Sequence, residues 1–152
     1  MARAARIGTL SVLLFSLGLS ASAKQLAVVV DKSNTVGQIT APELAKVFRF
    51  DNRKWPDGRN VVLVVLDPSA PDMRMIAEKV YHMPVDDLKT LLAAHRSSVV
   101  VVNNEEQLLK SVESIPGAVG VVDVYSITSR VNVLKVDGKL PLEQGYFLKG
   151  TQ

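Results

Sequence analysis

The feature of this 152-residue sequence that most constrains its fold is a series of short runs rich in valine, separated by longer helical patterns. The runs are five or six residues long, which suits strands and is too short for buried helices. Most of them are uninterrupted, as is typical of strands that are covered on both faces. They occupy residues 26–30, 61–66, 98–102, 118–122 and 131–136. Alternation of this kind predicts an α/β fold, with a mostly parallel or mixed central sheet flanked by helices in one compact domain.

Four helices are predicted between these strands, at residues 40–48, 71–81, 84–92 and 103–112. Thr40 and Glu43 have the spacing of a capping box, in which each side chain binds a free backbone N–H of the first turn. Ser69 and Asp72 offer a second cap of the same kind. The helical pattern therefore has its own start signals, independent of the strands.

The N-terminus has the pattern of a secretory signal. Two arginines precede an uncharged apolar stretch of 13 residues (7–19), and Ala21-Ser22-Ala23 supplies the small residues of a cleavage site. The alternative is a retained membrane anchor, but crossing a bilayer takes about 20 apolar residues. We therefore predict that residues 1–23 are a cleaved signal peptide and that residues 24–152 form a single domain. The processed chain is expected to be periplasmic or secreted, with no stable membrane insertion.

Composition argues against several classes of function. The chain has no cysteine, so disulfides and thiolate metal sites are ruled out. Aromatic residues make up 5% of it, too few for the usual single-strand nucleic-acid surface. Glu78 and His82 are spaced to share a metal, but one pair is a poor site. No catalytic motif, metal site or cofactor site is recognised, so we predict a protein that is not an enzyme and binds no nucleic acid.

Two loops are candidates for binding a small ligand. In open α/β sheets, ligands bind beyond the carboxyl ends of the strands. The first loop places Ser33, Asn34 and Thr35 after the strand at 26–30, and the second places Ser69 and Arg74 after the strand at 61–66. Hydroxyls, a guanidinium and the start of a helix suit an anion. The alternative is that Ser69 only caps its helix and Arg74 is a solvated surface residue.

Three stretches of the sequence resemble a known family. Residues 43–58 contain Leu44, Val47-Phe48, Trp55 and Asp57-Gly58 in order, residues 61–81 form a strand followed by a helix, and residues 104–122 end in Pro-Gly-Ala-Val-Gly-Val-Val. Together they resemble the phosphate-binding, substrate-binding proteins of ABC transporters, in a short form.

The resemblance implies a type 2 periplasmic-binding-protein-like fold that binds phosphate or a similar oxyanion for an uptake system. It implies that Ser33, Asn34, Thr35, Ser69 and Arg74 bind this ligand together, and that the partner is an ABC transporter permease or another envelope protein. The sequence departs from the family at the second loop, where Ser-Gly-Thr is replaced by Ser69-Ala70-Pro71.

The alternative function is an interaction module that kept the fold, binds no ligand and docks on another envelope protein. Exposed apolar surface around Trp55 or Phe147 would favour that alternative.

Overall fold

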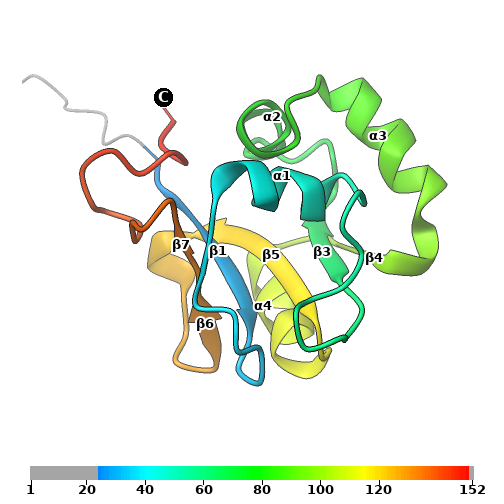
Figure 1. The fold of residues 1–152 in the computed structure, drawn as a ribbon. Coiled ribbons are helices and arrows are strands. Elements are labelled where there is room, and N and C mark those ends of the chain that lie inside the picture. The colour runs from blue at the N-terminus through cyan, green and yellow to red at the C-terminus, as the bar shows by residue number, and fades with distance from the viewer. Residues whose placement is uncertain (1–23, 151–152) are drawn as a thin grey trace, which may run out of the picture.

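The computed structural model describes residues 24–150, and its centre is a five-stranded sheet (Figure 1). The strands follow the order β4-β3-β5-β1-β6 across the sheet. Their bounds are β1 Leu26–Asp31, β3 Val62–Leu66, β4 Val99–Val102, β5 Ala118–Asp123 and β6 Val131–Val133. The predicted α/β class with a mixed sheet flanked by helices is confirmed. The predicted signal peptide lies outside the described residues.

One strand of the sheet runs against all the others. β3 is parallel to both β4 and β5, whereas β1 is antiparallel to both of its neighbours, β5 and β6. Every residue of β1 is buried. The uninterrupted apolar pattern predicts burial on both faces, but the pattern carries no information about strand direction.

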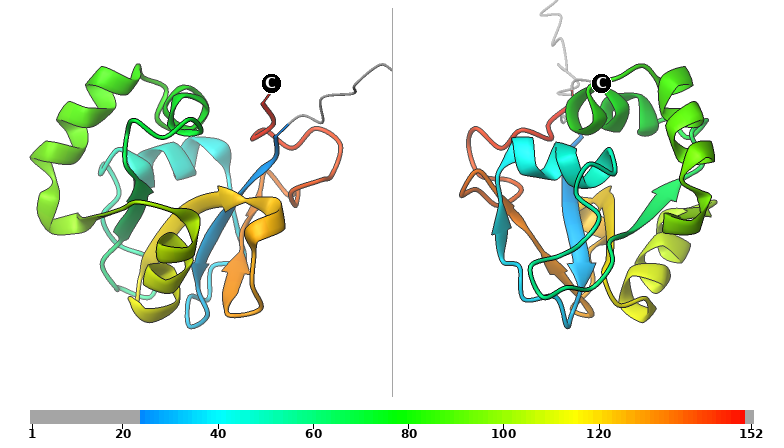
Figure 2. Two further views of the ribbon diagram at one scale, coloured as in Figure 1. Left: turned by 180° about the vertical axis from the view of Figure 1, so that it is seen from behind. Right: turned by 45° about the vertical axis from the view of Figure 1, so that its right-hand side comes forward.

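Helices cover both faces of this sheet (Figure 2). α4 (Glu105–Ser114) lies against one face, and α1 (Ala41–Phe48) lies on the other side of the sheet. α2 (Met73–Ile76) continues directly into a π-helical turn, η1 (Ala77–Tyr81), and α3 (Val85–Ala94) follows. Short 3₁₀ turns occupy Arg96–Ser98 and Val124–Ser126. None of the helices between residues 24 and 150 has the length and apolar character needed to span a bilayer.

The predicted cap of α1 is present. The Thr40 hydroxyl accepts the Glu43 N–H, and the Glu43 carboxylate accepts the Thr40 N–H in return. Asn104 caps α4 by accepting the Gln107 N–H at 2.9 Å. The start signal seen in the sequence at Thr40 therefore sets the boundary of α1, and the structure shows that Asn104 sets that of α4.

The end of the chain differs from the prediction of one strand at residues 131–136. β6 ends at Val133 and pairs with β1, whereas β7 (Lys135–Val136) pairs with β2 (Gln38–Ile39) in a separate two-stranded ladder. Leu134 separates the two strands and is fully buried, with its N–H donated to the Val28 carbonyl at 2.9 Å. An apolar run cannot show that its two halves belong to different sheets.

Trp55 belongs to the core. It is 4% exposed, and its indole N–H donates to the Gly117 carbonyl at 2.8 Å. Phe147 is half-buried and packs against the core. The exposed apolar surface that would favour an interaction module at Trp55 is therefore not found there.

Candidate functional site

The strand register places the two predicted ligand loops at opposite ends of the sheet. Val30 of β1 and Leu63 of β3 are both paired with Val119 of β5, so β1 ends where β3 begins. From Leu63 to Asp67 the chain advances four residues, or about 13 Å. In Figure 1 the loop after β1 is at the bottom of the molecule and α2 is at the top. The expectation of one site built from both loops is therefore wrong, because β1 is antiparallel.

The first loop is held by Arg59. Its guanidinium donates to the Ser33 hydroxyl at 2.6 Å and to the Ser33 carbonyl at 2.9 Å. The same group forms an ion pair with Asp57 at 2.6 Å and a longer one with Asp31 at 3.4 Å. The hydrogen bond from Arg59 lowers the pKa of Asp57 and raises that of the guanidinium itself. The polar groups of Ser33 are thus already engaged within the protein.

Asp31 and Asn34 complete this structural network. Asp31 is 3% exposed, accepts the Gly117 N–H at 3.1 Å and also accepts the Ser33 hydroxyl. Asn34 is buried, and its side-chain oxygen accepts the Val36 N–H at 2.9 Å. Thr35 is left exposed on the loop. The structure therefore gives this loop a role in joining β1 to the turns around Arg59 and Gly117.

In the second loop, the hydrogen-bond donors of Ser69 are also bound within the loop. Asp67 accepts the Ser69 hydroxyl at 2.5 Å and the Ser69 N–H at 2.9 Å, and these bonds lower the pKa of the Asp67 carboxyl. Ser69 therefore does not cap α2. The N-cap position is Asp72, whose side chain makes no capping bond.

The backbone of this loop offers few N–H groups to an anion. Pro68 and Pro71 have no N–H at all. The remaining N–H groups donate inside the protein, with the exception of that of Asp72, for which no such bond is present between residues 24 and 150. The pairs are Asp67 to Val102, Ser69 to the Asp67 side chain, Ala70 to Asp67, and Met73 to Ala70. The loop at residues 67–73 therefore leaves one of its own backbone donors, the Asp72 N–H, for an anion.

A groove of about 550 Å³ lies beside this loop, and Arg74 lines it. It lies between Lys24 at the start of the described residues, the helical segment α2–η1, and residues 149–150 at their end. Four of its lining residues are basic and two are acidic: Lys24, Arg74, Lys79 and Lys149 against Asp72 and Glu78. Pro71, Met75 and Gly150 complete the lining. Ser69 does not reach the groove.

Two of the four basic side chains already bind other groups of the protein. The Lys24 ammonium lies 2.8 Å from the Asp72 carboxylate and 3.7 Å from that of Asp123, and the hydrogen bond to Asp72 raises its pKa. Lys79 donates to the carbonyls of Phe147 and Lys149.

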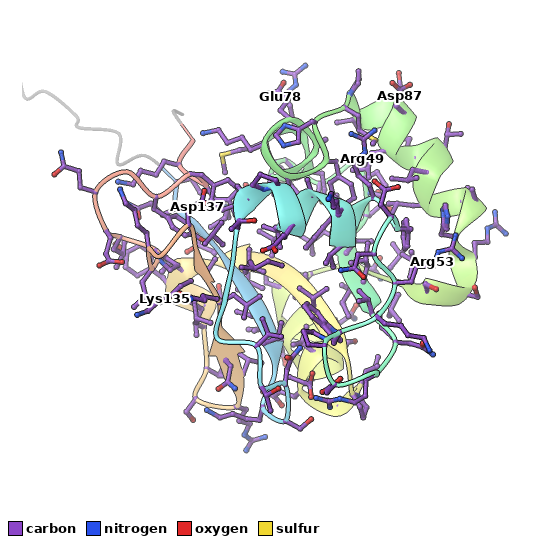
Figure 3. The ribbon with its side chains drawn as sticks, viewed as in Figure 1. Arg49, Arg53, Glu78, Asp87, Lys135 and Asp137 are labelled. Carbon is purple, nitrogen blue, oxygen red and sulfur yellow. The ribbon has the colours of Figure 1, made fainter. Side chains whose placement is uncertain are left out.

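Two charges in the groove remain available. Within residues 24–150, no carboxylate lies within 4.0 Å of the Arg74 or Lys149 charge. Glu78 is exposed on the outer side of the helical segment (Figure 3). The groove therefore has a local excess of positive charge, and Arg74 and Lys149 carry the part that a ligand can use.

Sequence reasoning found Arg74 but missed three of the groove's basic residues. Lys24, Lys79 and Lys149 come from three segments that are far apart in the chain. No local pattern marks a lysine as part of such a surface, so only the fold reveals it.

Metal-binding groups are sparse. No cluster of three or more His, Asp or Glu side chains that could hold an ion exists in the part of the chain that the structure describes. Glu78 and His82 thus have no third ligand there.

Comparisons with known proteins give the fold a family context. No family model and no curated protein sequence matches this chain. Among solved structures, PstS from Borrelia burgdorferi matches with a TM-score of 0.70 at 17% identity over 86% of this chain. The fold is that of phosphate-binding proteins. A phosphate-binding protein from Stenotrophomonas maltophilia matches with a TM-score of 0.66 at 16% identity over 79% of this chain. An ABC-type phosphate transport receptor from Vibrio cholerae matches with a TM-score of 0.63 at 17% identity over 78%.

The resemblance predicted from the sequence is confirmed at the level of the fold. The Stenotrophomonas and Vibrio structures are named as a phosphate-binding protein and a phosphate transport receptor, the Borrelia structure is named as PstS, and none is named as an enzyme. This chain spans 56%, 41% and 48% of the Borrelia, Stenotrophomonas and Vibrio chains, which is about half of their length. Identities of this size establish architecture, and function must be argued from the site.

Proposed function

We propose that this protein is an exported solute-binding protein that binds phosphate, or a similar small oxyanion, for an ABC-type uptake system. The observation that carries the proposal is the groove in which Arg74 and Lys149 have no carboxylate partner among the described residues. A guanidinium presents a planar fork of donors that matches paired anionic oxygens, and a lysine adds a point charge. The solved structures of the same fold that are named for phosphate support the choice of ligand.

The geometry also indicates how strong the binding should be. The donors are side chains on an open groove, and the neighbouring loop contributes almost no free backbone N–H. Charge-assisted hydrogen bonds contribute about 1.5–3 kcal/mol each, so two of them give a modest affinity. We expect a Kd of about 0.1–1 mM for phosphate, equivalent to about 4–5.5 kcal/mol of binding free energy.

The test combines processing and binding. The full precursor is expressed, the periplasmic fraction is collected, and the mass of the purified protein is measured by mass spectrometry. A mass corresponding to a chain that begins at Lys24 is expected. Phosphate is then titrated calorimetrically at fixed ionic strength, with sulfate and a neutral sugar in parallel.

The variants separate the two predicted loops. Arg74→Ala should weaken phosphate binding about tenfold, because it removes one charge-assisted contact. Ser33→Ala should leave binding unchanged, since Ser33 lies at the other end of the sheet. Arg130→Ala is the matched control, because Arg130 is an exposed arginine next to Val131, which pairs with Asp31 at that other end. Equal losses in Arg74→Ala and Arg130→Ala would show non-specific charge attraction and refute the site.

One observation favours a second candidate function. Apart from the Asp72 N–H, the backbone donors of the loop at residues 67–73 are used internally or replaced by proline. A chain that no longer binds an anion can tolerate this loss of donors. An envelope interaction module that kept the fold is this second candidate. It predicts no heat with any anion at protein concentrations that would detect millimolar binding.

A further inference from the structure

The strand β4 has an open outer edge. It is the terminal strand of the sheet and pairs only with β3. The Val102 carbonyl accepts the Asp67 N–H at 3.0 Å, so the backbone of Val102 faces β3. Backbone groups of successive strand residues point alternately to the two sides. Val100 therefore also faces β3, whereas Val99 and Val101 face outward. The Val99 N–H donates to the Arg96 carbonyl, which leaves the Val99 C=O and both backbone groups of Val101 at the open edge.

Apart from its length of four residues, β4 lacks the features that usually protect a sheet edge. Natural edges are short, or carry lysine, proline or a bulge, because free backbone groups recruit other strands. β4 consists of four consecutive valines, and the Val101 side chain is 53% exposed. At the other edge, by contrast, β6 has only three residues, and its Asn132 is hydrogen-bonded to Lys32.

A groove runs alongside the open edge, between β4 and α3 at the right of Figure 1. Its volume is about 270 Å³. The walls are mostly apolar, formed by Pro68, Leu92, Ala93, Val99 and Val101, and the remaining lining residues are Lys89 and Arg96.

Only one of these cations has a carboxylate within 4.0 Å among the described residues, and that ion pair is exposed to solvent. Lys89 has only a 3.8 Å contact with Asp86 on the surface of α3. Arg96 has no carboxylate within 4.0 Å in the described part of the chain. The groove therefore combines unpaired strand backbone, an apolar wall and two positive charges.

These charges decide between the possible occupants. A second copy that pairs through the same edge brings its own Lys89 and Arg96 to the groove, so that like charges meet. Residues 1–23 of the chain contain Arg3 and Arg6 and no acid, so they add positive charge as well. We propose that the β4 edge and the α3 groove bind an extended acidic segment of a partner polypeptide, which adds to the sheet as a further strand.

The binding mode follows from strand geometry. The added strand exchanges backbone hydrogen bonds with Val101 and donates one to the Val99 carbonyl, which supplies affinity without sequence preference. Alternate side chains of that strand point toward the same face. Apolar residues at the central positions enter the groove beside Leu92, and acidic residues at the flanking positions reach Lys89 and Arg96. This surface is separate from the anion groove and does not depend on it.

The test is an NMR titration of the purified full chain with a synthetic peptide, acetyl-Glu-Thr-Val-Thr-Val-Thr-Glu-amide. Its glutamates and valines lie on one face of a strand. We expect saturable shifts of the Val99 and Val101 amides, with a Kd of about 0.1–1 mM. The same peptide with lysine in place of glutamate should bind at least tenfold more weakly.

Variants make the test specific. Lys89→Glu combined with Arg96→Glu should reverse the preference between the two peptides. Lys110→Glu combined with Arg130→Glu is the control, since it reverses one exposed lysine and one exposed arginine elsewhere. The proposal is overturned if the Val99 and Val101 amides do not shift, or if both peptides bind equally. It is also overturned if sedimentation shows a dimer that Val101→Lys dissociates, because the occupant is then a second copy.

Discussion

Replacing Gly117 by alanine tests the close packing and the hydrogen bonds around this residue. Gly117 has a φ of +84°, in the left-handed region that favours glycine. A Cβ atom added there would lie 2.1 Å from the Asn60 carbonyl oxygen, so the backbone would have to move. The Gly117 carbonyl accepts both the Trp55 indole N–H at 2.8 Å and the Val62 N–H at 3.1 Å. A displaced backbone therefore breaks two hydrogen bonds in addition to being strained.

The expected loss of stability follows from these parts. A left-handed conformation costs alanine about 1–2 kcal/mol. The lost strand bond costs about 1 kcal/mol, and a buried indole N–H without an acceptor costs about 1–3 kcal/mol. Gly117→Ala should therefore lower the free energy of unfolding by about 3–6 kcal/mol.

Gly138→Ala is the matched control. Gly138 has a similar φ of +77°, but no atom lies within 4 Å of the position of its added Cβ. This variant should lose only the conformational part, about 1–2 kcal/mol. Urea unfolding of both variants at 25 °C measures the difference, which should be about 2–4 kcal/mol. Equal losses in the two variants would refute the close approach of Gly117 to Asn60 and the role of the Trp55 hydrogen bond.

Two further predictions concern buried tyrosines. The Tyr81 hydroxyl is fully buried without a hydrogen-bond partner in the described structure. Tyr81→Phe should therefore raise the free energy of unfolding by about 1 kcal/mol. Tyr125→Phe is the control and should not change it, because the Tyr125 side chain is 87% exposed. A Tyr81→Phe variant that is clearly less stable in urea would contradict this. Burial raises the pKa of Tyr81 and raises that of Tyr146 to about 12, whereas a tyrosine in the unfolded chain ionises near pH 10. Above about pH 10 the unfolded chain therefore loses protons that the native state keeps, and stability should fall by up to about 1.4 kcal/mol per pH unit for each tyrosine. Urea midpoints measured from pH 8 to 12 check this, and midpoints that stay flat up to pH 12 would rule it out.

Much of the fold could be predicted from the sequence because its signals are local. The valine-rich runs became strands, and Thr40 and Asn104 cap their helices as their spacing indicates. The pairing of those strands is not local. The direction of β1 and the division of residues 131–136 between two sheets depend on which partner each backbone meets.

The candidate site could be predicted only in part for the same reason. Arg74 was found because it follows a strand, and it does line a groove. The other basic residues of that groove meet only through the tertiary fold. Ser33 and Ser69 have the chemistry of ligand donors, but Arg59 and Asp67 bind their hydroxyls inside the protein. A sequence shows that a hydroxyl is available in principle, whereas a structure shows whether it is already used.

The residues that carry the family resemblance explain why it is informative about fold and less so about ligand. Trp55 belongs to the first resembling stretch and Gly117 to the third, and one buried hydrogen bond joins them. This joint lies at the end of the sheet where β3 begins, since the Val62 N–H donates to Gly117 there. The groove lined by Arg74 lies at the other end, and two of its basic residues, Lys24 and Lys149, are outside all three stretches. The contacts of this joint hold the architecture together and involve none of the basic residues of the groove. The ligand must therefore be established at Arg74 and Lys149, because the resemblance at Trp55 and Gly117 does not report on them.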